Sequence, residues 1–287
     1  MQMGPFCKLT NKDDVAALLK DDNLLILPIC DNLILIFNKM IDPSADSYLV
    51  VEQEHAPIVG LFHKQVRFFK YYVNAYKAKN VDIFILLNRV IYEAYIKMLY
   101  LIDNPNDVKE YRALAFKTHL KILEDERFAD TPILAVFKKK FDDAIKVENL
   151  SIEDIKNARK NPGGKNFRQM QEIYEPGLYN AIYSMTSDCI HSGWNEIRQM
   201  YLRCDEDNRL YFADINYSQE LHFRMLLTMA EVLMTSSLYY YNWVSKNYPG
   251  VVPNVSRIIL EIKRVCKLIN DVVIDTYKNN PEEYLYK

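Results

Sequence analysis

Side chains that can donate or accept protons recur every four residues in the stretch 177–200. They are Tyr179, Tyr183, Ser187 and His191. If the stretch is a helix, each step of four residues turns by only about 40°, so these groups form one slowly winding stripe. A histidine with an ordinary pKa of about 6.5 can exchange protons near neutral pH. This stripe is the strongest functional candidate in the sequence.

A second polar feature lies in the apolar segment 81–102, where Arg89 and Glu93 are one helical turn apart. Burying an ion without a partner is costly, so these side chains are expected to pair with each other or to face a polar cavity. In the first case they form an internal ion pair that fixes helix register. In the second they share a site with His191, where the guanidinium would bind a phosphate or a carboxylate.

The segment 156–168 is a third candidate, because it is basic and contains no acidic residue. Its basic side chains are Lys156, Arg159, Lys160, Lys165 and Arg168. Together with two glycines, Lys165 and Arg168 could hold an anion, although the spacing of a phosphate-binding P-loop is missing. The alternative is an ordinary solvated basic loop.

Metal and nucleophilic chemistry fit the sequence less well. A carboxylate-bridged metal site needs more ligands than Glu93 and the single pair Asp188 and His191, so no metal and no other cofactor is expected. A triad of Ser187, His191 and Asp188 lacks the glycine-flanked serine turn that hydrolases use. The sequence therefore leaves open whether the protein is an enzyme.

The composition of the 287 residues is that of an ordinary globular protein, with 49% hydrophobic residues, 26% charged residues and a formal charge of −2. This charge argues against a protein that coats nucleic acids or membrane surfaces, and DNA is not an expected partner. The cysteines have no CxxC spacing, so we expect no disulfide framework and a cytoplasmic location. The most apolar run, 24–41, is interrupted by polar residues and Pro28, and no transmembrane segment is expected.

Apolar periodicity and a low glycine content of 7 residues predict an all-α protein, a multi-helix bundle. Helices are expected over 11–20, 50–79, 81–102, 107–127, 132–147, 166–174, 177–200, 217–246 and 254–278, with a short one opening at Ser151. Periodicity cannot assign residues 24–37, although their length favours a helix. A small β-hairpin is expected near 201–213. The bundle is expected to span 51–287, with residues 1–50 as an N-terminal helical appendage.

Three motifs resemble an uncharacterised bacterial helical family that is known only as a domain of unknown function. They are Asn88-Arg89-x-x-x-Glu93, Lys165-Asn-Phe-Arg-Gln-Met, and Tyr179-x-x-x-Tyr183-x-x-x-Ser187-x-x-x-His191. The similarity covers roughly Val81 to Trp194 and extends towards Phe212. The resemblance implies an α-helical, cytoplasmic, bacterial protein, and it implies no particular activity.

The arrangement is also distantly similar to the HEPN superfamily of helical proteins, which includes metal-independent ribonucleases of toxin–antitoxin and phage-defence systems. The HEPN signature places an arginine four to six residues before a histidine on one helix, so that both meet an RNA phosphate. In this sequence no arginine precedes His191 at that distance, and Arg198 follows it. Arg89, from another helix, would have to take the place of that arginine.

The leading functional expectation is a polar pocket that binds a small anion, a nucleotide or an RNA phosphate, in a bacterial defence or stress system. The pocket would be formed by Arg89, Glu93, Tyr183, Ser187 and His191. One alternative is a metal-independent HEPN-like ribonuclease with His191 as general acid or base. Another is a structural or interaction protein with a buried network of Arg89, Glu93 and His191. A homodimer is compatible with the sequence, and a membrane is not an expected partner.

Overall fold

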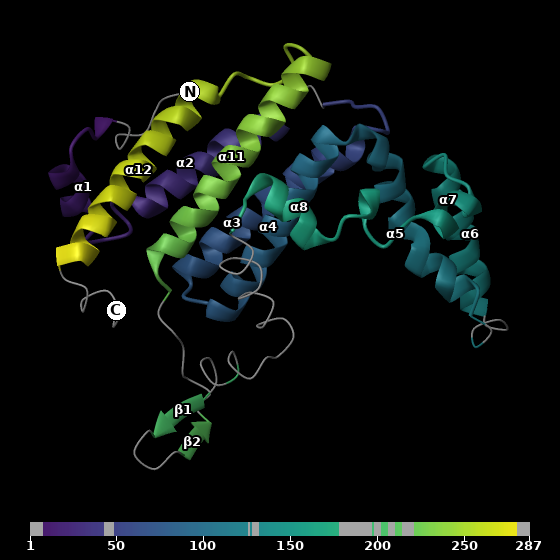
Figure 1. Ribbon diagram of the computed structural model, residues 1–287, viewed down its shortest axis with the longest axis horizontal. Helices are drawn as coiled ribbons and strands as arrows, with labels where there is room; N and C mark the ends of the chain where they lie inside the picture. The colour runs from purple at the N-terminus through teal and green to yellow at the C-terminus, as the bar shows by residue number, and fades with distance from the viewer. Residues whose placement is uncertain are drawn as a thin grey trace. The chain divides into compact units, whose positions relative to one another are not determined.

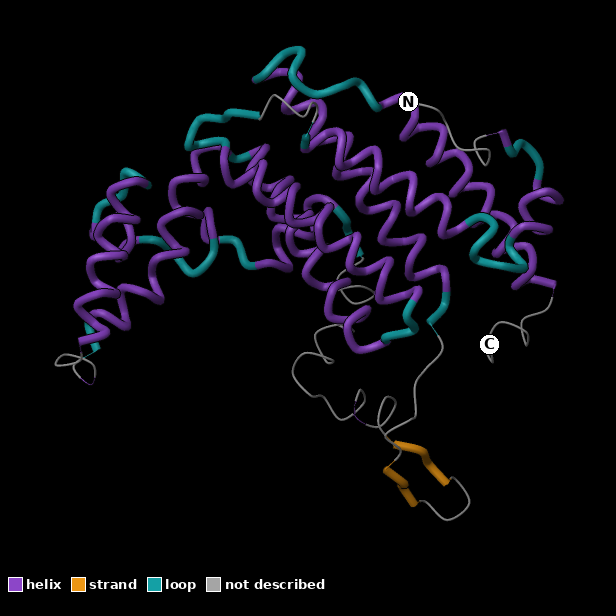
Figure 2. Tube along the Cα trace, turned by 180° about the vertical axis from the view of Figure 1, so that it is seen from behind, coloured by secondary structure: helices purple, strands orange, loops and turns teal. Residues whose placement is uncertain are grey.

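The computed structural model describes residues 8–42, 49–125, 127, 132–177, 197, 202–205, 210–213 and 221–279. Within these ranges the protein is built from α-helices, with short 3₁₀ turns and two short strands (Figures 1 and 2). The predicted all-α class is therefore confirmed. Among the described helices, none combines the length and apolarity needed to cross a lipid bilayer.

The chain divides into two compact units. The first unit takes its described residues from 1–49, 62–95 and 178–287, and the second takes 50–61 and 96–177. The described helices that lie wholly in the first unit are α1 (Lys12–Leu18), α2 (Ile26–Ile41), α11 (Phe223–Asn247) and α12 (Ser256–Asn279). The unit division falls within α3 (Ala56–Lys77) and α4 (Val81–Asp103).

In the first unit α11 packs against both α2 and α12, and α1 packs against α12 (Figure 1). The run 24–37, which periodicity leaves unassigned, begins just before α2 and continues as this helix. Successive residues such as Ile26 and Leu27, and again Ile29 and Cys30, are buried in α2. The buried residues of α2 nevertheless lie within about half of its circumference, and the sequence pattern is obscured because apolar residues such as Leu35, 60% exposed, also occupy the solvent side.

Stacked aromatic rings join the helices in the core of the first unit. Phe62 of α3 stacks on Tyr240 of α11 with ring centroids 4.0 Å apart. Tyr72 of α3 stacks on Phe84 of α4 at 3.9 Å. Each of these rings is buried or nearly so, and such pairs stabilise a core by about 0.5–1.5 kcal/mol beyond their burial. The second stack sets the contact of the antiparallel helices α3 and α4.

The second unit contains α5 (Val108–Leu123), α6 (Pro132–Val147), α7 (Ile152–Asn157) and α8 (Phe167–Tyr174), with 3₁₀ turns at Pro105–Asp107 (η2) and Pro162–Gly164 (η4). α5 packs against both α6 and α7. Phe116 of α5 meets Phe141 of α6 edge to face at 6.1 Å, inside a small apolar core. The outer side of α6 is left exposed, as described below.

Local capping signals in the sequence match the observed helix starts. Asn11 caps α1 by accepting a hydrogen bond from the backbone N–H of Asp14 at 2.8 Å. Ser151 and Asp154 form a reciprocal capping box at the start of α7. Residue type and spacing account for both caps, and the expected helix that opens at Ser151 is present.

The expected hairpin is present as two antiparallel strands, β1 (Leu202–Asp205) and β2 (Leu210–Ala213), with Leu202 opposite Ala213. The expected helix 177–200 lies outside the described residues except for Gly177 and Ile197. That helix stays a prediction.

Candidate functional site

The described part of the chain contains four of the predicted site residues. Arg89 and Glu93 lie on α4 in the first unit. In the second unit Lys165 lies between η4 and α8, and Arg168 lies in the first turn of α8. The remaining four, Tyr179, Tyr183, Ser187 and His191, lie outside the described residues. The structure therefore gives the surroundings of the arginine, the glutamate and the basic segment.

Arg89 and Glu93 interrupt an otherwise buried part of α4. Both side chains are half-buried, whereas Leu87, Ile91 and Ala94 around them are 8% exposed or less. Both charged residues interact with other groups. Partial desolvation strengthens the hydrogen bonds that a guanidinium donates, whereas a neighbouring carboxylate can hold its orientation but competes with an external anion.

The position of these two residues around the helix follows from the aromatic stack between α3 and α4. Counting about 100° per residue from Phe84, Arg89 lies about 140° and Glu93 about 180° around α4. Both therefore point away from the side of α4 that stacks on Tyr72 of α3. The side of α4 that carries Arg89 and Glu93 is therefore not the side that packs against α3.

Some buried polar atoms of the first unit have no hydrogen-bond partner among the described residues. Asn88, next to Arg89, is 8% exposed, and its Oδ1 has no hydrogen-bond partner among the described residues. The same holds for Nε2 of His63 on α3, and burial lowers the pKa of this histidine. Sequence analysis did not single out His63, because one histidine among apolar residues gives no local signal.

Part of the positive charge of the basic segment is neutralised by carboxylates of the second unit. Arg159 donates to Glu110 of α5 from Nε at 2.8 Å, from Nη2 at 2.6 Å and from its backbone N–H at 2.8 Å. The Arg159 guanidinium is the main cause of the low pKa of Glu110, about 2. Lys156 forms an ion pair with Glu124 at 2.9 Å. Two of the five basic side chains thus have carboxylate partners within their own unit.

The glycine pair of this segment also turns towards Glu110. Gly163 adopts a φ of 61°, and its backbone N–H donates to Glu110 Oε2 at 3.1 Å. A Cβ at this position would lie 1.9 Å from the hydroxyl of Tyr100 and 2.3 Å from a carboxylate oxygen of Asp107. The anion held by this turn is therefore a carboxylate of the protein itself.

Tyr100 and Lys165 complete the same corner of the second unit. The hydroxyl of Tyr100 donates to Asp107 at 2.5 Å. Burial of the tyrosine and its hydrogen bond to this carboxylate together raise the pKa of Tyr100 to about 12. The Nζ of Lys165 lies 5.3 Å from the centre of the Tyr100 ring, in a cation–π contact. Arg168 is exposed on α8. Binding of an external anion by Lys165 and Arg168 stays a prediction.

Metal ligation has no candidate in the described part of the chain, where no group of three potential His, Cys, Asp or Glu ligands comes together. Two of the histidines that the structure describes have structural roles. His222 caps α11 by accepting a hydrogen bond from the Arg224 backbone N–H at 3.2 Å. His119 of α5 stacks on Phe137 of α6 at 5.5 Å.

Comparison with known proteins gives one match. The model of a family of unknown function (DUF5677) matches residues 55–209, a range that contains Arg89, Glu93 and the predicted stripe up to His191. No curated protein and no solved structure matches the chain. The match confirms the expected resemblance to an uncharacterised family and begins earlier, within the residues leading into α3. The distant likeness to the HEPN superfamily stays a prediction.

Proposed function

The chain belongs to this family of unknown function, and we propose that it binds a phosphate-bearing ligand, a nucleotide or RNA, through Arg89 of α4. One observation carries the proposal. Arg89 is half-buried one turn before Glu93, between residues that are almost fully buried, on the side of α4 away from its stack with α3. A bacterial cytoplasmic setting in a defence or stress system belongs to the same proposal.

The chemistry of the two side chains supports this class of ligand. A guanidinium offers paired N–H donors that match two oxygens of one phosphate, and partial burial strengthens such hydrogen bonds. Glu93 would orient the guanidinium and accept a hydrogen bond from a ribose hydroxyl. Tyr179, Tyr183, Ser187 and His191 are the proposed remaining contacts of the ligand.

A ribonuclease that uses His191 as general acid or base remains the second candidate, because Arg89 would then stabilise the charge of the reacting phosphate. A buried network with no ligand is the third. The three functions differ in what happens when Arg89 is changed. A binding protein would lose ligand affinity, a ribonuclease would lose cleavage, and a buried network would lose stability. These three properties can be measured separately on the same variants.

The test compares Arg89→Lys with Arg67→Lys in the full chain. Arg67 is a matched control, because it lies in the same unit on an exposed part of α3 and its guanidinium bonds only loosely to Tyr71, at 3.5 Å. The ligands are inorganic phosphate, AMP, ATP and a 20-nucleotide single-stranded RNA. We expect Arg89→Lys to weaken binding of the ligand that binds best by about tenfold or more, because lysine lacks the paired donors.

Cleavage and stability decide between the proposal and its competitors. Each variant, together with His191→Ala, is incubated with the RNA in EDTA and is melted thermally. RNA binding without cleavage supports a binding protein. Cleavage that both Arg89→Lys and His191→Ala abolish, at unchanged melting temperature, would establish the ribonuclease. No binding of any ligand, with a strongly lowered melting temperature, would establish the internal network.

A further inference from the structure

An apolar stripe runs along the outer side of α6 in the second unit. Ile133, Val136 and Val147 are 79%, 59% and 76% exposed. With Lys140 and Asp143 they follow one another at intervals of three and four residues, the a and d positions of a coiled-coil heptad. We call these five residues the α6 seam.

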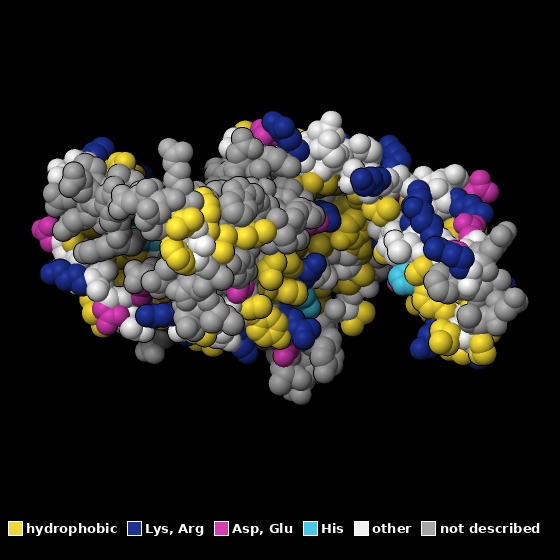
Figure 3. Space-filling model, turned by 90° about the horizontal axis from the view of Figure 1, so that it is seen from below, with side chains coloured by type: hydrophobic (Ala, Val, Ile, Leu, Met, Phe, Trp, Pro, Cys, Tyr) yellow, Lys and Arg dark blue, Asp and Glu magenta, His cyan; other side chains and the backbone are white. Residues whose placement is uncertain are grey.

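The opposite side of α6 already has its packing partner. Phe141 is buried against Phe116 of α5. Phe137 lies between this side and the seam, and it stacks on His119 of α5. The seam therefore faces away from the core of its own unit. Hydrophobic and basic side chains lie side by side on the surface of the part of the molecule that contains α6 (Figure 3).

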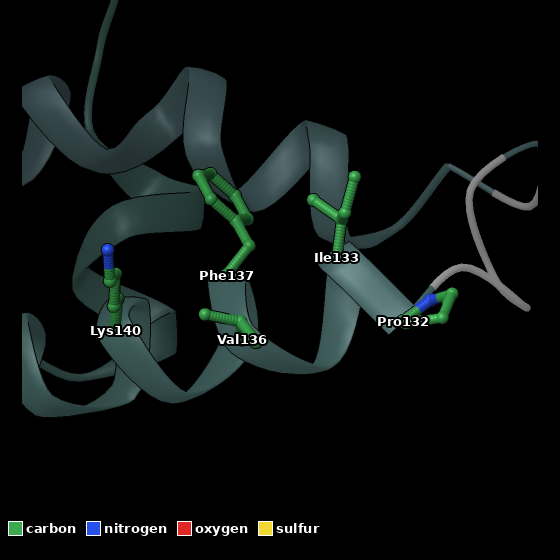
Figure 4. Close-up of a pocket in the computed structure, with 5 residues that line it drawn as sticks. All are labelled: Pro132, Ile133, Val136, Phe137 and Lys140. Atoms are coloured by element: carbon green, nitrogen blue, oxygen red, sulfur yellow. The ribbon is translucent and has the colours of Figure 1, made fainter.

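A hollow of about 390 Å³ lies at the N-terminal half of the seam (Figure 4). Its lining residues are Pro132, Ile133, Val136, Phe137 and Lys140. Four of them stand at positions i, i+3, i+4 and i+7 of one helix. This is the spacing of the hole that receives a side chain from a facing helix in knobs-into-holes packing.

We propose that a second copy of this chain docks on the α6 seam, with its own α6 running antiparallel to the first. In this register Val147 of the second copy enters the hollow and packs against Val136, and by symmetry Val136 of the second copy packs against Val147. Lys140 lies opposite Asp143 of the second copy, and Asp143 lies opposite its Lys140. The contact is isologous, so that each surface is its own complement.

The order of charges along α6 decides between this occupant and others. In a parallel pair Lys140 would face Lys140 and Asp143 would face Asp143, two repulsive contacts. The lysines of α6 would attract an acidic partner or an anionic membrane, but Asp143 in the middle of the seam would face like charge in either complex. The antiparallel copy gives both charged positions an opposite charge and pairs Val136 with Val147, while Ile133 lies beyond the paired positions, past the end of the second α6.

The expected contact is weak. The seam follows 16 residues of helix, about 24 Å, which is short for a protein interface. Lys139 and Lys146 flank the seam and approach their counterparts at its rim, where solvent and salt screen their repulsion. The dimer should therefore form at high protein concentration. This assembly is independent of the ligand proposed for α4.

The test uses charge exchange within the seam of the full chain. Sedimentation velocity over a concentration series gives the dimer dissociation constant for wild type, Lys140→Asp, Asp143→Lys and the double variant. Each single change makes both central pairs repulsive and should raise the dissociation constant about tenfold, and the double variant should restore it. Lys138→Asp, on the far side of α6 from the seam, should leave the dissociation constant close to that of wild type.

The result that overturns the proposal is specific. A wild-type protein that stays monomeric up to millimolar concentration has no second copy on this seam. If neither single change alters the dissociation constant, or if the double variant does not restore the wild-type value, the dimer forms through another surface. All five residues are exposed or line an open hollow, so the variants keep the fold, and thermal melting checks this directly.

Discussion

The guanidinium of Arg159 donates hydrogen bonds to both carboxylate oxygens of Glu110, a residue 49 positions earlier in the chain. Backbone N–H groups of Arg159 and Gly163 donate to the same carboxylate. The glycine turn that could have held a phosphate is thus shaped around an internal carboxylate. This relationship explains how a segment with five basic residues and no acid is held against α5.

Replacing Glu110 by glutamine should destabilise the second unit. The change keeps the size of the side chain, removes its charge and leaves donors of Arg159 and Gly163 poorly matched. We expect a loss of about 1–3 kcal/mol in the free energy of unfolding, measured by urea denaturation. The matched control is Glu124→Gln, whose ion pair with Lys156 is about half exposed on both sides and should cost far less. Equal effects of the two changes would contradict this role of Glu110.

The same carboxylate should leave a signature in acid. Arg159 holds the pKa of Glu110 at about 2, below its ordinary value of 4.5. A lowered pKa in the folded state contributes stability above pH 4.5, and this contribution is lost as the pH falls towards about 2. The stability difference between wild type and Glu110→Gln should therefore be constant near neutral pH and shrink between about pH 4.5 and 2. A difference independent of pH would show that the charge is not responsible.

Gly163→Ala should be far more damaging than Gly250→Ala. Both glycines have positive φ values, 61° and 81°, so both substitutions carry the backbone cost of the left-handed region, about 1–2 kcal/mol. A Cβ on Gly163 also collides with Tyr100 and Asp107, whereas a Cβ on Gly250 meets no atom within 4 Å. Because the backbone cost is common to both variants, the difference between their melting temperatures reports the cost of the collision. Similar melting temperatures would mean that Tyr100 and Asp107 can move to make room for the added methyl group at little cost.

A buried serine of α11 should matter in the first unit. Ser236 donates to Gln65 Oε1 of α3 at 2.6 Å, and neither residue has any exposed surface. Ser236→Ala removes a donor from this buried acceptor and should cost about 1–2 kcal/mol in the free energy of unfolding. The equally buried Ser237 bonds to the carbonyl of Met234 on its own helix, at 2.8 Å. Because that contact does not join two helices, Ser237→Ala should cost less, and the opposite ranking would refute this account of the α3–α11 contact.

Features that depend on neighbouring residues could be predicted from the sequence. The caps at Asn11 and Ser151, the proline start of α6 and the paired strands near 201–213 follow from local residue preferences, and the structure has all of them. The half-buried state of Arg89 could likewise be expected, because a charge in an apolar helix stays near a polar group or near water.

Features that depend on distant residues could not be predicted. Nothing near Glu110 indicates that Arg159 and Gly163 will enclose it, because folding alone brings these positions together. Periodicity does not assign residues 24–37 because apolar residues such as Leu35 lie on the exposed side of α2 as well as on its buried side. The seam of α6 follows from its heptad spacing only once Phe141 is seen to occupy the opposite side.

The central claim is that Arg89 binds a phosphate-bearing ligand. The most direct measurement is the binding of a labelled 20-nucleotide RNA, followed by fluorescence anisotropy at one fixed salt concentration. Wild type, Arg89→Lys and Arg67→Lys are compared, after thermal melting has shown that the three proteins have the same melting temperature. Our account predicts that Arg89→Lys binds about tenfold more weakly and that Arg67→Lys binds like wild type. Equal affinity of all three proteins would contradict it.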